Sequence, residues 1–215
     1  MKVCNLRKED FSDVLLFFNG WGMDYRIMEN RIDGCDVFVF YDYRDMEACP
    51  GFPDLSSYEN IYVAAWSMGV WAASYWLGKT GLSVRTSVAL CGTESPIDDN
   101  YGISELFYKI TLKGIRKMGP SKFYERMIAG DKDSEDFAGR LPERKDQAEE
   151  LEALWNLCMA VKPVFPWDKA VIAREDKIFP YESQKSWWMQ RGVEVLEISG
   201  GHYPFANIDL KELLI

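Results

Sequence analysis

Residues 61–77 read IYVAAWSMGVWAASYWL. The first five form a short apolar run typical of a buried strand, and Met68 to Leu77 is rich in Ala, Trp and Leu at helical spacing. Ser67 lies at the junction, between the small residues Ala65 and Gly69, as the tight turn of a nucleophile elbow requires. The stretch therefore predicts a reactive serine, although a serine that only caps a buried helix fits the same residues.

Further short apolar runs predict a mostly parallel sheet around this strand. Each run is bounded by turn residues, and continuous apolar runs are typical of strands buried on both faces. The predicted helix separates the run at 61–65 from the next one, so this order predicts a right-handed βαβ unit. A second helix is expected over residues 181–190. The further runs lie at residues 14–18, 36–41, 87–90, 169–173 and 193–198.

The pattern changes between the runs at 87–90 and 169–173. Residues from about 104 to 160 show helical periodicity, many Lys, Arg and Glu, and no convincing strand. We interpret this segment as a helical insertion that forms a lid, because no repeat or Pro-rich linker divides the 215 residues. The chain is therefore expected to be a single domain, with a core of residues 1–103 and 161–215.

Composition limits the functions open to this chain. The formal net charge of −9 argues against a nucleic-acid or anionic membrane partner, because such binding depends on clustered Lys and Arg. No stretch approaches the roughly 18 apolar residues needed to cross a bilayer. Five scattered cysteines without a C-x-x-C pair argue against disulfides and structural zinc. We expect a cytoplasmic monomer with no metal and no cofactor.

The chain contains one histidine, so His202 is the single candidate for an imidazole base. It lies in the loop Gly200-Gly201-His202, directly after the last predicted strand. A lone histidine is more often structural, yet a nucleophilic serine of this kind needs its base at the end of a strand. We therefore predict that His202 takes the proton of Ser67.

The acid that orients this base is expected after the penultimate predicted strand. That strand, residues 169–173, is followed closely by Glu175 and Asp176. We assign Asp176, whose carboxylate is expected to fix the tautomer of His202 and stabilise the imidazolium. Glu175 and the more distant Asp42 stay open as substitutes. For any one of these carboxylates the commonest alternative is a solvent-exposed side chain with no catalytic role.

Two backbone N–H groups are candidates for binding an oxyanion. Met68 follows Ser67 at the start of a helix, whose dipole favours developing negative charge. Trp21 lies in the loop NGWG at 19–22, where flanking glycines let its N–H approach a ligand closely. Such a loop alone fits a plain turn, but its position before the predicted elbow favours an oxyanion hole.

Ser67, Asp176 and His202 occur in the chain order of α/β-hydrolases, and each follows a predicted strand. The sequence thus predicts an α/β-hydrolase fold, with a mostly parallel central sheet flanked by helices, and a serine hydrolase with a Ser-His-Asp triad. One rival hypothesis is an esterase or thioesterase for another small acyl substrate, which would use the same reacting groups. Another is a non-catalytic α/β-hydrolase-like binding module, against which the complete triad argues.

The candidate residues lie in four strings, which are FNGWG at 18–22, AWSMG at 65–69, DKIFP at 176–180 and GGHYPF at 200–205. These strings are more specific than the nucleophile elbow alone, since W-S-M-G and G-G-H-Y-P-F are unusual in other hydrolases. Over nearly its whole length, the chain resembles the BioG family of pimeloyl-acyl carrier protein methyl esterases. The resemblance implies hydrolysis of that methyl ester in biotin precursor synthesis, through an acyl-enzyme on Ser67. It gives His202, Asp176 and the two amides the roles assigned above.

The resemblance also implies that the lid covers an acyl channel and meets an acidic acyl carrier protein bearing a methyl pimeloyl chain. Clustered basic residues in the insertion suit this partner, although a solvated helix face fits them equally well. Aromatic and thioether side chains there could line the channel, but at helical spacing such residues more often pack into the core. The basic residues are Lys109, Lys113, Arg116, Lys117 and Lys122, and the others are Phe107, Tyr108, Met118, Phe123, Tyr124 and Met127.

Overall fold

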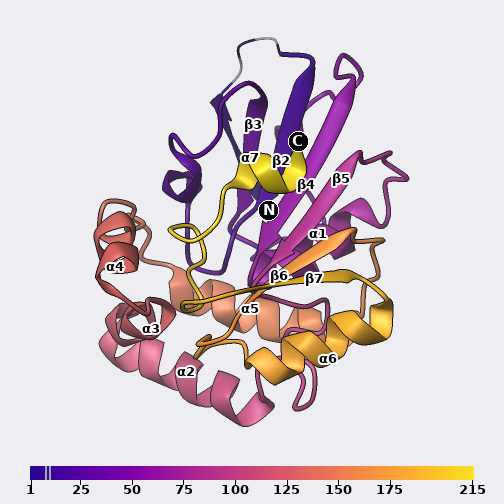
Figure 1. Ribbon diagram of the computed structural model, residues 1–215. Coiled ribbons are helices and arrows are strands. Elements are labelled where there is room, and N and C mark those ends of the chain that lie inside the picture. Colours follow the sequence, from indigo (N-terminus) through magenta and orange to yellow (C-terminus); the bar gives the residue numbers. More distant parts are fainter. Residues whose placement is uncertain (8, 10) are drawn as a thin grey trace.

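The computed structural model describes residues 1–7, 9 and 11–215. Within these residues, seven strands form one sheet in the order β1-β3-β2-β4-β5-β6-β7 (Figure 1). Strands β2 to β7 pair in parallel, and β1 pairs antiparallel with β3. The predicted mostly parallel sheet is therefore confirmed. The strands are β1 (Lys2–Arg7), β2 (Asp13–Phe18), β3 (Asp36–Tyr41), β4 (Asn60–Trp66), β5 (Thr86–Leu90), β6 (Lys169–Ala173) and β7 (Glu194–Ile198).

Each predicted apolar run forms a strand. The interior strands are covered on both faces, whereas β7 lies at the edge of the sheet and its side chains are partly exposed. The side chains from Val14 to Phe18 in β2 have no exposed surface, and β4 is almost as deeply buried. Burying such side chains contributes about 1.5–3 kcal/mol for each large one, which is why the runs contain so few polar residues.

Strand β1 was not predicted from the sequence. It pairs with β3 and lies at the edge of the sheet, with several partly exposed side chains. Polar and charged residues are common in edge strands because one side of the strand faces solvent. The polar stretch that begins the chain therefore lacks the apolar run by which the interior strands are recognised.

The helices flank this sheet. Helix α1 (Met68–Leu77) packs against β2 and β4, and α6 (Tyr181–Arg191) packs against β6 and β7, as their predicted positions require. Two short helices, η1 (Tyr25–Met28) and α7 (Leu210–Leu214), were not predicted. In the part of the chain that the structure describes, no helix is long and apolar enough to span a membrane.

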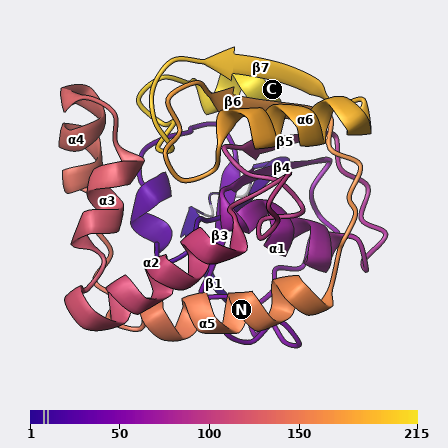
Figure 2. The same cartoon turned by 90° about the horizontal axis from the view of Figure 1, so that it is seen from below.

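The segment between β5 and β6 is helical, as expected. Its helices gather at the lower end of the sheet in Figure 1, and Figure 2 shows the same group from below. Helices α2 and α5 pack against each other, and α3 packs against α2. Whether this group acts as a lid stays a prediction. The helices are α2 (Glu105–Met118), α3 (Ser121–Met127), α4 (Asp131–Ala138) and α5 (Gln147–Ala160).

Parallel strands place their carboxyl ends at one edge of the sheet. Ser67 follows β4, Asp176 lies just beyond β6 and His202 lies just beyond β7. Trp21 follows β2 at the same edge. Ligand sites of open α/β sheets form in the crevice at this edge, so the topology alone brings these residues into one neighbourhood.

Candidate active site

Ser67 lies in a strained turn between β4 and α1. Its backbone angles, φ 59° and ψ −125°, are rarely adopted by a non-glycine residue. Gly69 makes the turn possible, because a Cβ there would lie 2.2 Å from the carbonyl oxygen of Phe18. The turn has the tight geometry of a nucleophile elbow, and the need for a small residue follows from contact with the neighbouring strand.

A second glycine supports the same turn and was not singled out from the sequence. A Cβ on Gly92, just beyond β5, would lie 2.4 Å from the carbonyl oxygen of Ser67. The N–H of Ser67 donates to the carbonyl of Leu90 at 2.9 Å. The end of β5 therefore packs directly against the backbone of the serine.

The side chains of Ser67, His202 and Asp176 form one hydrogen-bonded chain. Nε2 of His202 lies 2.8 Å from Oγ of Ser67, and Nδ1 lies 2.8 Å from Oδ2 of Asp176. All three residues are buried. A carboxylate that accepts a hydrogen bond from Nδ1–H selects the tautomer whose Nε2 can accept the proton of the serine hydroxyl. The three predicted residues thus come together in the order that nucleophilic catalysis requires.

Asp176 is held by three donors. Its Oδ1 accepts hydrogen bonds from the N–H groups of Ile178 at 2.8 Å and Phe179 at 2.9 Å. The side-chain amide of Gln184, on α6, donates to Oδ2 at 3.1 Å. These contacts fix the carboxylate that faces His202. The role of Gln184 was not predicted, because nothing near it in the sequence distinguishes it from other helical glutamines.

The two alternative acids lie elsewhere. Glu175 is exposed, and its carboxylate accepts the N–H of Gly200 at 2.5 Å. Asp42 follows β3 and pairs with Arg44 and with Lys2, whose Nζ lies 2.8 Å from Oδ2. These cations hold the pKa of Asp42 well below its usual range, although its burial acts in the opposite direction. The geometry therefore favours Asp176 over both alternatives.

His202 is positioned by aromatic residues and by the helical insertion. The indole N–H of Trp66 donates to the carbonyl of His202 at 2.9 Å, and the Phe179 ring stacks on the imidazole with an interplanar angle of 8°. The next residue, Tyr203, donates its N–H to the carbonyl of Met127 at 3.0 Å. The end of α3 therefore contacts the loop that carries the candidate base.

Cys91 is a second potential nucleophile close to this site. It directly follows β5 and is fully buried, with a φ of 45°. Burial, together with the negative charge of Asp176, raises the pKa of the Cys91 thiol well above its usual value. The thiol therefore stays protonated at neutral pH, and only a thiolate is an effective nucleophile.

The amides predicted to bind an oxyanion are both available. The N–H groups on either side of Trp21 donate to the side chains of Asn19 at 2.9 Å and Glu150 at 3.1 Å. Met68 is the first residue of α1, where an N–H has no partner within the helix. Among the hydrogen bonds of residues 1–7, 9 and 11–215, none uses the N–H of Trp21 or Met68 as donor. Both amides are therefore free to bind a ligand beside Ser67.

An apolar pocket opens onto the candidate triad. The empty space between its lining atoms is about 430 Å³, part of it open to solvent, and six of its 14 lining residues belong to the insertion. Four of the six aromatic and thioether residues singled out in the insertion line it, whereas Met118 is exposed and does not. The lining residues are Gly20, Trp21, Trp66, Ser67, Met68, Ile103, Phe107, Tyr108, Thr111, Phe123, Met127, Leu151, Ile178 and His202.

The predicted basic cluster lies on the surface of α2 and α3. All five of its side chains are exposed. Lys109 pairs with Glu105 at 3.2 Å and Arg116 pairs with Glu152 at 2.5 Å, so two of the charges are partly compensated. The ion pairs in the described part of the chain do not involve the other three, which are Lys113, Lys117 and Lys122.

Comparisons with solved structures identify the fold. BioG from Haemophilus influenzae matches over 100% of both chains, with a TM-score of 0.88 and 32% identity. A lipase-esterase related protein from Clostridium acetobutylicum matches 95% of this chain and 93% of its own, with a TM-score of 0.63 and 15% identity. The second likeness concerns the fold alone. The predicted α/β-hydrolase fold is confirmed.

Sequence comparisons identify the family. A malonyl-[acyl-carrier protein] O-methyltransferase of Bacteroides fragilis is 39% identical over 202 residues, which cover 92% of this chain. The chain spans 40% of that relative, so the two proteins differ greatly in length. The family model described as pimeloyl-ACP methyl esterase BioG matches residues 2–213. The chain therefore belongs to the BioG family.

Proposed function

We propose that this chain is a serine carboxylesterase that hydrolyses the methyl ester of pimeloyl-acyl carrier protein. The observation that carries the proposal is the 2.8 Å contact between Nε2 of His202 and Oγ of Ser67, at the wall of an apolar pocket. Membership of the BioG family supports the choice of substrate. The reaction is the step that removes the methyl group during biotin precursor synthesis.

In the proposed mechanism, Oγ of Ser67 attacks the ester carbonyl carbon while Nε2 of His202 takes the hydroxyl proton. The N–H groups of Trp21 and Met68 bind the oxyanion that forms. When the tetrahedral intermediate collapses, the C–O bond to the methoxy group breaks, and methanol leaves with the proton from His202. Asp176 stabilises the imidazolium between these two transfers.

The acyl-enzyme is then hydrolysed by the same groups. His202 takes a proton from water, and the resulting hydroxide attacks the carbonyl of the acyl-serine. The second tetrahedral intermediate is bound by the same two amides. Its collapse returns the proton to Oγ of Ser67 and releases a free carboxylate on the pimeloyl chain.

The helical insertion supports the proposed substrate in two ways. The apolar side chains of Phe107, Phe123 and Met127 face the pocket, where they can pack along a methylene chain. The exposed cluster on α2 and α3 is basic in a chain with a net charge of −9, which suits an acidic carrier protein. We propose that the insertion is the lid of the pocket and that this cluster, Lys109, Lys113, Arg116, Lys117 and Lys122, docks the carrier protein.

The experiment compares kcat/KM for methyl pimeloyl-acyl carrier protein with that for short p-nitrophenyl esters, using Ser67→Ala as the matched control. We expect strong preference for the carrier-protein substrate, and loss of both activities in a folded Ser67→Ala variant. Faster turnover of short esters, or of other acyl thioesters, would assign the chain to a different hydrolase. If a fluorophosphonate failed to label Ser67 and no ester were hydrolysed, a non-catalytic binding module would replace the proposal.

A further inference from the structure

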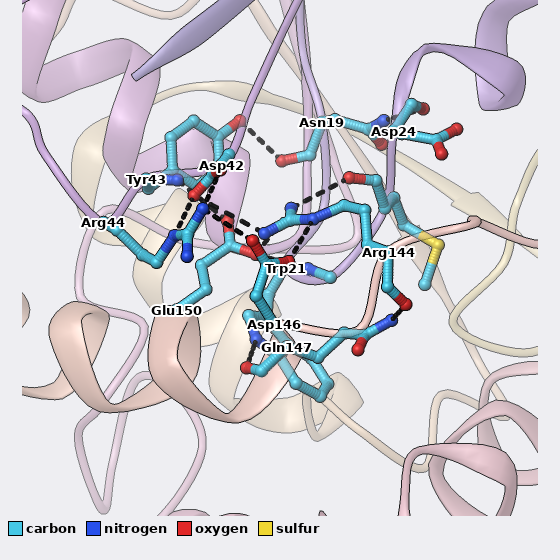
Figure 3. Close-up of polar contacts among 12 residues, drawn as sticks. Asn19, Trp21, Asp24, Asp42, Tyr43, Arg44, Arg144, Asp146, Gln147 and Glu150 are labelled. Atoms are coloured by element: carbon cyan, nitrogen blue, oxygen red, sulfur yellow. Dashed lines mark hydrogen bonds and ion pairs between the residues drawn. The ribbon is translucent and has the colours of Figure 1, made fainter.

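A buried carboxylate connects the helical insertion to the loop that carries Trp21. Glu150, on α5, has no exposed surface. Its Oε2 accepts the N–H of Gly22 at 3.1 Å, and its Oε1 accepts the N–H of Tyr43 at 2.9 Å. Figure 3 shows this carboxylate together with the guanidinium of Arg144, which lies 2.8 Å from Oε2. One side chain thus joins segments far apart in the sequence.

The same loop is fixed at two further points. The indole N–H of Trp21 donates to the carbonyl of Gln147, also on α5, at 2.8 Å (Figure 3). The hydroxyl of Tyr43 donates to the carbonyl of Asn19 at 2.7 Å. The first turn of α5, which carries Gln147 and Glu150, and the side chain of Tyr43 therefore hold the loop, and Glu150 also binds the backbone N–H of Tyr43.

This arrangement is costly unless each group keeps its partner. Burial raises the pKa of the Glu150 carboxyl, an effect opposed by Arg144 and the two amide donors. Arg144 in turn pairs with Asp146 at 2.9 Å, and its side chain is only 9% exposed. A buried charge that loses its partner is strongly destabilising, so Glu150 and Arg144 each depend on the contacts described above.

We propose that Glu150 is a positioning residue for the oxyanion hole, a role that rests on the function proposed above. By binding the N–H of Gly22, it keeps the preceding peptide oriented so that the N–H of Trp21 points at the developing oxyanion. It does not touch the substrate. The helical insertion, in addition to covering the pocket, sets the position of one of the two oxyanion donors.

The test replaces Glu150 by Gln, which keeps the size of the side chain but puts an NH₂ where one acceptor oxygen stood. On a short ester we expect kcat to fall about 10- to 100-fold with little change in KM, since loss of a whole oxyanion donor costs about 10²- to 10³-fold. Affinity for a trifluoromethyl ketone, whose adduct on Ser67 carries an oxyanion, should weaken by a similar factor. Affinity for the matching alcohol, which forms no adduct, should not change.

Glu94→Gln is the matched control. Glu94 is also a buried carboxylate, bound to Ser74 at 3.0 Å and Arg191 at 2.6 Å. None of the hydrogen bonds and ion pairs described for Glu94 reaches the Trp21 loop, residues 19–22. It should lower stability without changing ketone affinity. An equal effect on kcat and ketone affinity in both variants would overturn the proposal, because activity would then merely follow stability.

Glu150→Asp provides a second variant in which Arg144 keeps a charged partner but the shorter carboxylate cannot reach both amides. It should fold more stably than Glu150→Gln and still lose ketone affinity. Wild-type ketone affinity in either folded variant would overturn the proposal, as would failure of both to fold, since Glu150 would then support the whole fold. Because the test uses short esters, its result does not depend on the natural substrate. The proposed carrier-protein substrate could therefore be wrong while the Glu150 result stands.

Discussion

A Cβ on Gly92 would lie 2.4 Å from the carbonyl oxygen of Ser67 and 3.0 Å from its Cα. The end of β5 and the turn after β4 are thus packed backbone to backbone. Any side chain at residue 92 has to push the serine out of position, since the atoms it would meet are main-chain atoms that cannot rotate away. The position of the candidate nucleophile is therefore set by a neighbouring strand as well as by its own turn.

Gly92→Ala should accordingly lower kcat on a short ester by about 10- to 100-fold, because small displacements of a reacting group are costly. It should also lower the free energy of unfolding by about 1–3 kcal/mol, as overpacking does. Gly114→Ala is the control, since nothing lies within 4 Å of a Cβ there in α2. That variant should keep full activity and gain stability. Equal activity in the two variants would contradict this account of Gly92.

Asp176→Asn should lower kcat by about 10³- to 10⁴-fold with the fold intact. An amide can occupy the same volume and keep the contacts to Ile178 and Phe179, but it does not favour the tautomer of His202 that accepts a proton from Ser67. Steady-state kinetics and circular dichroism check the two parts of the prediction. Glu175→Gln, at an exposed position, should leave kcat nearly unchanged. A larger effect at Glu175 would reverse the assignment of the acid.

Reversing charge at Lys113 and Lys117 should weaken use of the carrier-protein substrate. These two lysines are chosen over Arg116 because Arg116 already pairs with Glu152. The double Lys→Glu variant should lower kcat/KM for methyl pimeloyl-acyl carrier protein about tenfold at low salt and less at high salt, because surface charges are screened. Hydrolysis of a short ester should not change.

The control for this variant carries the same change in net charge elsewhere on the surface. Lys79 and Lys162 are exposed and lie outside α2 and α3, so Lys→Glu at both should leave the carrier-protein substrate unaffected. If both double variants reduce its turnover equally, the effect arises from overall charge. The docking proposal for α2 and α3 would then be wrong.

Asp136 is expected to contribute to stability in a pH-dependent way. Despite partial burial, hydrogen bonds from Arg31, Tyr203 and Arg140 lower the pKa of its carboxyl to about 2. Because this pKa is lower in the folded than in the unfolded chain, the stabilisation is present above about pH 4 and is lost as the pH falls toward 2.

The measurement is urea unfolding of wild type and Asp136→Asn across this pH range. At pH 7 the variant should be less stable by about 1 kcal/mol, a figure reduced from the full linkage value to allow for solvent screening. The difference should shrink as the pH falls from about 4 and vanish only below about pH 2. Glu135→Gln, an exposed position on the same helix, should show no such trend. A difference as large at pH 2 as at pH 7 would contradict the linkage argument.

The interior of the fold could be read from the sequence because it depends on local patterns. Strands such as β2 and β4 are covered on both faces, so nearly all of their residues are apolar and the runs stand out. The elbow was equally recognisable, since the tight turn requires small residues two positions before and after Ser67, which are Ala65 and Gly69. Edge strand β1 was not predicted, because its side chains are partly exposed to solvent and polar residues among them interrupt the apolar pattern.

The supporting residues of the site could not be found in this way. Gln184 and Glu150 are ordinary helical residues in the sequence, and their roles arise from contacts with Asp176 and Gly22. Gly92 is one of 16 glycines, and only packing against Ser67 distinguishes it. In each case the partner lies in a different element, so no local pattern carries the signal.

The sequence by itself determined the parallel sheet, the strand-to-helix turn at Ser67 and the chain order of the three candidate catalytic residues, because these follow from apolar periodicity and steric limits within short segments. Only the tertiary structure decided that Asp176 rather than Asp42 faces His202. It also decided which residues of the insertion reach the pocket, and that α5 holds the Trp21 loop. Such contacts depend on how elements pack in three dimensions, where distance along the chain places no restriction on which side chains meet.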